Sequence, residues 1–325
     1  MDERFLIDFG VFMQAVADLA AGLNPYAREG FFSPPWLFYL LSPFSLLPTQ
    51  IGATAWFMMS LGTLVACISS VSTKHRYRLL WITALAISPI VWPYVLFGNI
   101  IGLVGIGLVG LFNWKRSWLA VPLVLLKPQL SLVAMVMWVL RSGWKQVAKA
   151  SGLLVILNLP LFIWKPSLYR DFLYKSVSGQ YLETQSHHIA AATSWLPFGS
   201  VIWVASSATL IAILLLLSLW AKNKRVTFLS TILADPVAGG GEYALLAVAA
   251  AMGDLDRRNL AVAVVTVFAL PFISIFVRRG NMLAPLATAI LLAWAIYSRT
   301  ENKPAPNARG RIRGSGDSRH DLRKA

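Results

Sequence analysis

Three cations stand in or beside strongly apolar sequence, where a charge is costly. Lys127 lies in LLKPQL, and a lysine at the centre of a membrane helix costs about 2.5 to 3.5 kcal/mol on insertion scales. Such a residue is a candidate functional site, although its long side chain can also reach the membrane surface. Arg278 and Arg279 are adjacent in FVRRGN. Their forked donors suit phosphate, and two exposed residues in a turn are the alternative.

Four acids accompany these cations. Asp8 and Asp18 lie in LIDFGVFMQAVADLAAGLNPY, and Asp235 and Glu242 flank the break in LADPVAGGGEY. From the residues alone, Asp8 is either a helix cap or solvated acid or a base that takes a proton. Asp18 fits an exposed helix face. Asp235 and Glu242 either line a cavity or pair with Lys127.

The sequence favours no metal site and no cofactor. His187 and His188 follow Glu183 in LETQSHHIA, but adjacent histidines diverge, and a loop that is solvated or contacts an acceptor fits them better. We find no Gly-rich nucleotide loop before a helix and no Asp-x-Asp pair, so a nucleotide-sugar donor is not supported. The single cysteine, Cys67, lies in an apolar run and fits a packing thiol.

Composition predicts an all-α polytopic integral membrane protein with one membrane domain. Hydrophobic residues make up 57% of the chain and charged residues 13%, and several runs approach the roughly 20 apolar residues that cross a bilayer. The net charge of +15 is partly concentrated in residues 299–325, which we expect to be a disordered basic cytoplasmic tail near anionic lipid. Nucleic-acid binding is therefore disfavoured.

Basic loops set the expected topology through the positive-inside tendency. Residues 51–71 run inward to the basic loop STKHRYR, residues 79–98 return outward, and residues 100–113 descend to Lys115 and Arg116. The transmembrane domain is predicted to cover 1–298.

Two later segments have basic clusters at both ends, so a single crossing would place one cluster outside. Residues 117–140 break at Lys127-Pro128, and residues 226–252 break at Asp235-Pro236 and the following glycines. Proline interrupts a helix, so each segment is predicted to be a bent or re-entrant hairpin. Irregular backbone at that depth must face protein or a wet cavity, and Lys127 should point into one.

The remaining segments complete the topology. Residues 149–164 run outward to an extracytoplasmic loop at 165–200, and 201–220 return. The last pair of spans, 259–277 and 282–297, places Arg278 and Arg279 outside, against the positive-inside tendency; a phosphate held there would account for them.

Because successive spans alternate in direction, residues 1–50 are also placed outside, as an extracytoplasmic loop with interfacial helices. Apolar side chains recur at helical spacing at Phe9, Phe12, Met13, Val16 and Leu19, and PPWLFYLLSPFSLLP is too short to span. No preceding span carries this loop across. We expect that a first span lies upstream of Met1, the alternative being unaided translocation.

The order of several motifs resembles family GT87 (the DUF2029 group), membrane glycosyltransferases of the GT-C superfamily. The residues that carry the resemblance are DFGVFMQAVADLAAGLNPY, FFSPPWLFYLLSPFSLLP, FGN and LLKPQLSL, over roughly residues 6–140. The chain departs from the family at Phe32-Ser33-Pro34-Pro35, in place of Tyr-Pro-Pro, and at Gly98-Asn99, in place of Gly-Gln-x-Asn. The remaining residues agree only in hydropathy and loop placement.

The resemblance implies a mannosyltransferase that crosses a cell membrane several times, most simply a bacterial plasma membrane. The sugar would pass from a polyprenyl-phosphate donor to a lipid or glycan acceptor on the extracytoplasmic face. Asp8 would be the catalytic base, Lys127 with Arg278 or Arg279 would steady the lipid phosphate, and Asn24 and Tyr26 of the Asn-Pro-Tyr motif would bind substrate. The alternatives are a transporter or flippase of lipid-linked sugars and a truncated, non-catalytic membrane subunit.

Overall fold

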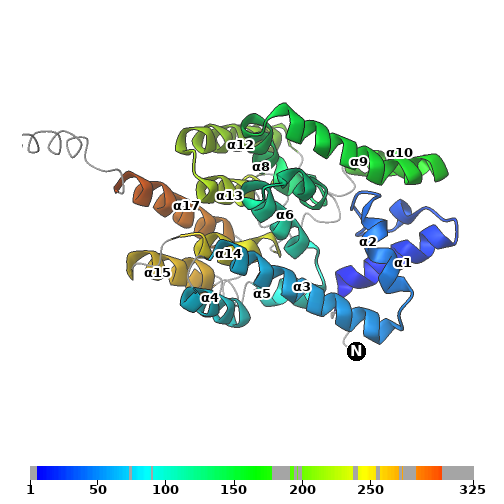
Figure 1. Cartoon of the computed structure of the whole chain (residues 1–325), viewed down its shortest axis with the longest axis horizontal. Helices are drawn as coiled ribbons and strands as arrows, with labels where there is room; N and C mark the ends of the chain where they lie inside the picture. The colour runs from blue at the N-terminus through cyan, green and yellow to red at the C-terminus, as the bar shows by residue number, and fades with distance from the viewer. Residues whose placement is uncertain are drawn as a thin grey trace, which may run out of the picture.

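The described residues of the chain form helices and no strand (Figure 1), which confirms the predicted all-α class. The computed structural model describes residues 6–72, 75–88, 91–177, 191–193, 196, 200–236, 241–253, 257–270, 273 and 283–301.

In the described part of the chain, three helices are long and apolar enough to cross a membrane. They are α3 (Thr49–Val71), α9 (Trp144–Trp164) and α12 (Val201–Ala221), of 23, 21 and 21 residues. At 1.5 Å per residue, 21 residues extend about 32 Å, which matches a hydrocarbon core about 30 Å thick. In α9 only 11% of the apolar window is buried inside the protein. Its apolar side chains therefore face outward, as in a membrane protein.

Shorter helices occupy the other predicted spans. The predicted span 79–98 is divided into α4 (His75–Ile87) and α5 (Val91–Phe97), and α6 (Ile101–Asn113) follows. Near this division the Ser88 hydroxyl donates to the carbonyl of Val267. The predicted span 259–277 begins as α15 (Arg257–Val264) and continues as a π-helix, η4 (Val265–Ala269). The last helix, α17 (Leu283–Glu301), extends three residues into the predicted tail.

The helices meet at a basic end, which we define by Asn113, Ser117, Arg141, Ser218 and Lys224. The Lys224 ammonium donates to the Asn113 side chain at 2.8 Å, and the Arg141 guanidinium donates to the Ser218 carbonyl at 3.1 Å. Helices α6, α8 and α12 end here and α13 begins here. The alternation expected from the basic loops therefore holds for these helices.

The first predicted hairpin is bent as expected. It consists of η2 (Ser117–Ala120), α7 (Val121–Val124) and α8 (Pro128–Arg141), with the break at residues 125–127. Pro128 is the first residue of α8, a position that tolerates its missing N–H. The Trp138 indole donates to the Ser117 hydroxyl at 2.9 Å, so both arms reach the basic end. Lys127 lies at the tip.

The second hairpin returns in the same way. It consists of α13 (Lys224–Leu233), η3 (Gly241–Ala244) and α14 (Leu245–Ala251). The Asn223 side chain caps α13 by accepting from two backbone N–H groups. The Arg225 guanidinium donates to the Ala249 carbonyl at 3.0 Å, which ties the two arms together at the basic end. Asp235 and Glu242 flank the tip.

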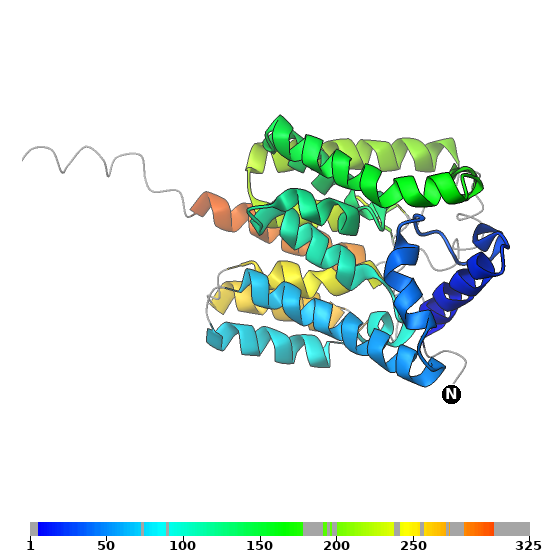
Figure 2. The same ribbon diagram turned by 45° about the vertical axis from the view of Figure 1, so that its right-hand side comes forward.

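The N-terminal segment covers the opposite end of the bundle, called here the capped end. Helices α1 (Ile7–Ala20) and α2 (Leu37–Ser45) lie across it, beside the end of α9 and α10 (Ser167–Val177) (Figures 1 and 2). The predicted apolar stripe of α1 is buried against the protein itself. The Phe9 ring lies 5.4 Å from the Trp56 ring and 6.3 Å from the Phe44 ring, measured between centroids.

Candidate active site

Asp8 lies in the first turn of α1, where the turn between α5 and α6 holds it. The Asn99 amide donates to Asp8 Oδ2 at 2.8 Å, and the Asn99 carbonyl oxygen accepts from the backbone N–H of Ile101 at 3.1 Å. The backbone N–H of Leu6 also donates to the Leu96 carbonyl at 2.6 Å. The start of α1 and the start of α6 are thus fixed to each other.

Gly98 makes this approach possible. Its φ of +73° lies in the left-handed region, and a Cβ there would come within 2.9 Å of the Leu6 side chain. The Trp56 indole donates to the Gly98 carbonyl at 2.7 Å. A residue other than glycine would strain the turn and push Leu6 away, and the bond from Asn99 to Asp8 would be lost.

A lysine–glutamate pair joins the tips of the two hairpins. Lys127 Nζ lies 2.5 Å from Glu242 Oε1, and the two side chains are 16% and 5% exposed. Glu242 thus takes one of the two roles considered for the acids at the second break. Asp235, on the other side of the second break, is buried. Because the hairpins come from segments over 100 residues apart, the ion pair depends on the whole bundle.

The charges of Lys127 and Glu242 both affect the pKa of Asp8. Burial raises the pKa of the Asp8 carboxyl above its usual value, and Glu242 adds to that rise, while the Lys127 charge and the Asn99 hydrogen bond oppose it. A carboxylate with a raised pKa is a stronger base. Among the described residues, Asp8 Oδ1 accepts no hydrogen bond. The arrangement can therefore take a proton at Asp8 beside a cation that can stabilise a developing negative charge.

Asn24 and Tyr26 lie at the other end of α1. From Asp8 to the last residue of α1, Ala20, the helix is about 18 Å long. The Asn24 side chain accepts from the Tyr26 backbone N–H at 2.9 Å, and the Tyr26 hydroxyl donates to the Ser33 carbonyl at 2.9 Å. The structure brings Asp8 and Lys127 together but does not bring Asn24 and Tyr26 to them.

Two lysines hold this second region against α9 and α10. The Lys165 ammonium donates to the carbonyls of Gly22 and Leu23, each at 2.9 Å. Lys175 is buried and donates to the carbonyls of Tyr26 and Arg28. Burial lowers the pKa of the Lys175 ammonium. Asp18 forms an ion pair with Arg28 at 2.8 Å, and its side chain is 17% exposed, so it is less exposed than predicted.

Several predicted residues lie outside the described residues. Arg278 and Arg279 are among them, as are Glu183, His187 and His188. Within the described part of the chain, no group of three His, Cys, Asp or Glu could hold a metal ion.

Sequence reasoning missed one polar residue of the site. The Gly98-Asn99 turn was noted as a departure from a family motif, yet Asn99 is the hydrogen-bond partner of Asp8. The signal was a glycine followed by a side-chain amide between two apolar runs. Such a turn permits a close approach, but the sequence does not show what approaches.

A comparison with known proteins finds similarity to GPI mannosyltransferase 1 of Schizosaccharomyces pombe, 32% identical over 124 residues. The aligned part covers 35% of this chain, and the chain spans 32% of that relative. No family model matches the chain, and no solved structure matches it. Together with the apolar helices, this similarity supports a glycosyltransferase-like membrane protein. Membership of family GT87 stays a prediction.

Proposed function

We propose that this protein is a glycosyltransferase that moves a sugar, mannose in the first instance, from a polyprenyl-phosphate donor to a lipid or glycan acceptor. The observation that carries the proposal is the convergence of Asp8 with the Lys127–Glu242 ion pair. The likeness to a mannosyltransferase supports the sugar. The resemblance of the N-terminal motifs to family GT87 supports the donor.

The proposed reaction is a direct displacement at the anomeric carbon of the donor. The acceptor hydroxyl oxygen bonds to that carbon, and the bond from the carbon to the phosphate oxygen breaks. Asp8 takes the hydroxyl proton. The electron pair leaves with the polyprenyl phosphate, whose charge Lys127 stabilises. Asn99 orients the carboxylate so that Oδ1 faces the incoming hydroxyl.

The proposed face is extracytoplasmic, because the basic end of the bundle fits the cytoplasm and Asp8 lies at the capped end. We propose a bacterial plasma membrane with several crossings. Arg278 and Arg279, which lie outside the described residues, are proposed to bind the donor phosphate. Asn24 and Tyr26 are proposed to act on substrate only through the loop that they hold in place.

The test is sugar transfer in membranes that contain the full chain, with radiolabelled polyprenyl-phosphate mannose and a total lipid and glycan extract as acceptor. Asp8→Asn removes the base and should abolish incorporation. Asp18→Asn is the matched control, because it makes the same change on the same helix, away from the Lys127–Glu242 ion pair. Incorporation by Asp8→Asn at the level of the unaltered protein would refute the assignment of the base.

The paired broken hairpins also suit a transporter or flippase of lipid-linked sugars. The same membranes separate the two functions. If mannose, glucose and arabinose donors all give no product while a labelled donor crosses the bilayer, the protein transports. If neither occurs, a non-catalytic subunit is the better description.

A further inference from the structure

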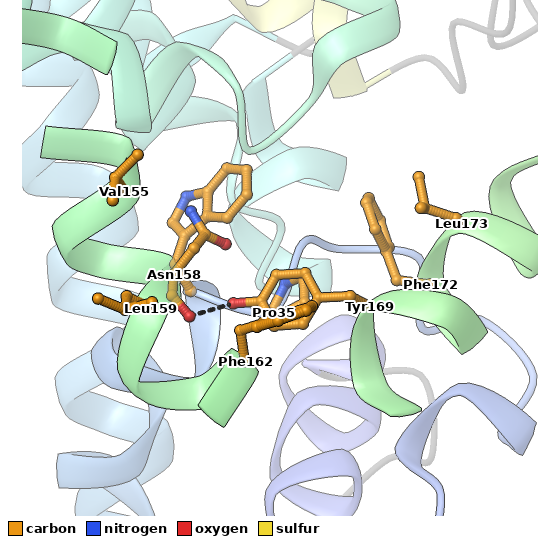
Figure 3. Close-up of a pocket in the computed structure, with 9 residues that line it drawn as sticks. Pro35, Val155, Asn158, Leu159, Phe162, Tyr169, Phe172 and Leu173 are labelled. Carbon is orange, nitrogen blue, oxygen red and sulfur yellow. Dashed lines mark hydrogen bonds between the residues drawn. The ribbon is translucent and has the colours of Figure 1, made fainter. Parts of the chain in front are cut away.

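An apolar groove lies between the end of α9, α10 and the turn that precedes α2. Its volume is about 400 Å³, within the range of small-molecule sites. Val155, Leu159 and Phe162 line it from α9, and Phe172 and Leu173 line it from α10 (Figure 3). The rest of the lining is formed by Pro35, Trp36, Asn158 and Tyr169.

Three polar groups along this groove donate hydrogen bonds within the protein. The Asn158 side-chain amide donates to the Leu154 carbonyl at 2.7 Å. The Tyr169 hydroxyl donates to the backbone carbonyl of Asn158 at 2.9 Å (Figure 3). The Trp36 indole donates to the Pro122 carbonyl at 3.3 Å. The exposed lining is almost wholly apolar, so a sugar or a headgroup would lose its hydrogen bonds to water there, whereas a hydrocarbon chain needs none.

The groove lies where a hydrocarbon chain could enter from the membrane surface. On α9 its lining begins at Phe162, two residues before Trp164, whose exposed side chain lies at the end of the helix and fits the aromatic belt. From Phe162 the lining extends back to Val155, about 10 Å along the helix. Leu159, Phe162 and Leu173 are about half exposed at its rim. Because α9 is a candidate span whose surface is mostly outside the protein core, the groove opens toward lipid.

One wall of the groove is tied to the hairpin that carries Lys127. Trp36 is bonded to Pro122, and Pro122 precedes Lys127 by five residues on that hairpin. In the proposed reaction Lys127 holds the donor phosphate. The polyprenyl chain is joined directly to that phosphate, so it must leave the site beside this hairpin.

From this geometry we propose that the groove binds the isoprenoid chain of the polyprenyl-phosphate donor. This inference rests on the proposed function for the identity of the lipid. Phe172 also packs against Tyr26, with ring centroids 5.7 Å apart and the rings tilted by 51°. The Asn-Pro-Tyr loop thereby supports the chain site rather than the reacting atoms.

The test is photocrosslinking of the full chain in membranes, with benzoylphenylalanine placed at Leu159. The probe is radiolabelled polyprenyl phosphate without a sugar, which binds but cannot react. Ile156 is the matched control position, because it lies on the same helix, is 68% exposed and does not line the groove. Label at Leu159 should exceed label at Ile156 several-fold, and unlabelled polyprenyl phosphate should displace it.

Two outcomes would overturn the inference. Equal label at both positions would mean that the groove contacts bulk lipid only. Displacement by phosphatidylglycerol as readily as by polyprenyl phosphate would mean that an ordinary membrane lipid occupies it. The binding result does not depend on turnover, so specific label in a protein that transfers no sugar would leave the chain site standing while the proposed function fails.

Discussion

The two ends of α1 carry the two motifs that define the N-terminal segment, yet the structure uses them differently. At the first end, Asp8 accepts one hydrogen bond from Asn99 and lies within the field of the Lys127–Glu242 pair. At the second end, Asn24 and Tyr26 are engaged in bonds to the backbone, and their own loop is fixed by two lysines.

This difference suggests that the first end of α1 takes part in the reaction and that the second end supports the structure. A base needs an oxygen that can still accept a proton, and Asp8 has one in a setting that raises its pKa. A hydroxyl that already donates to a carbonyl, as in Tyr26, holds a loop in place instead. The comparison predicts that changes at the first end alter the rate and that changes at the second end alter stability.

The largest expected effect is on the rate at Asp8. A general base contributes about 10²- to 10⁴-fold, so Asp8→Asn should lower the initial rate of sugar transfer by that factor. The thermal midpoint in detergent should change little. Asp8→Glu keeps a carboxylate and should recover part of the rate. A rate loss of the same size in Asp18→Asn would break the comparison.

The next effect concerns the ion pair between the hairpin tips. Lys127→Met leaves Glu242 as a buried charge without its cation, which costs about 3 to 5 kcal/mol of unfolding free energy. The double variant Lys127→Met with Glu242→Gln removes both charges and should recover most of that stability, measured by thermal denaturation in detergent. Transfer should stay low in the double variant. If sugar transfer recovered in the double variant, Lys127 would have only a structural role.

The pH dependence sharpens the role of Asp8. A base must be deprotonated, so the rate should rise with pH through the raised pKa of Asp8, with an inflection above the usual value for aspartate. Asn99 donates to the charged form and thereby lowers that pKa. Asn99→Ala should therefore move the inflection to higher pH. An inflection that moves to lower pH would contradict the assignment.

Local periodicity was enough to predict much of the fold. The stripe of α1, the spans α3, α9 and α12, and the bends at Pro128 and Pro236 follow from apolar spacing and from proline, both of which act over a few residues. The basic clusters also predicted that each hairpin returns to its starting end. Among the described residues, the division of the span 79–98 into α4 and α5, the π-helix η4 and the extension of α17 to Glu301 were missed.

The site could be predicted only in part, because its contacts join distant segments. Lys127 was found from its cost in apolar sequence, and Glu242 was one of two acids that could pair with it. Asn99 acts on Asp8 across 91 residues, and no local pattern encodes such a contact. Asn24 and Tyr26 were assigned by resemblance, which does not distinguish a residue that binds substrate from one that holds a loop.

The smallest expected effect tests the scaffold end directly. Tyr26→Phe removes the hydroxyl that donates to the Ser33 carbonyl, a neutral bond worth about 0.5 to 1.5 kcal/mol. The ring contacts with Phe31 and Phe172 are kept, so the thermal midpoint should fall only slightly and the transfer rate and donor KM should not change. If Tyr26 instead binds the sugar, the donor KM should rise without a comparable loss of stability. That result would move the second end of α1 from scaffold to substrate site.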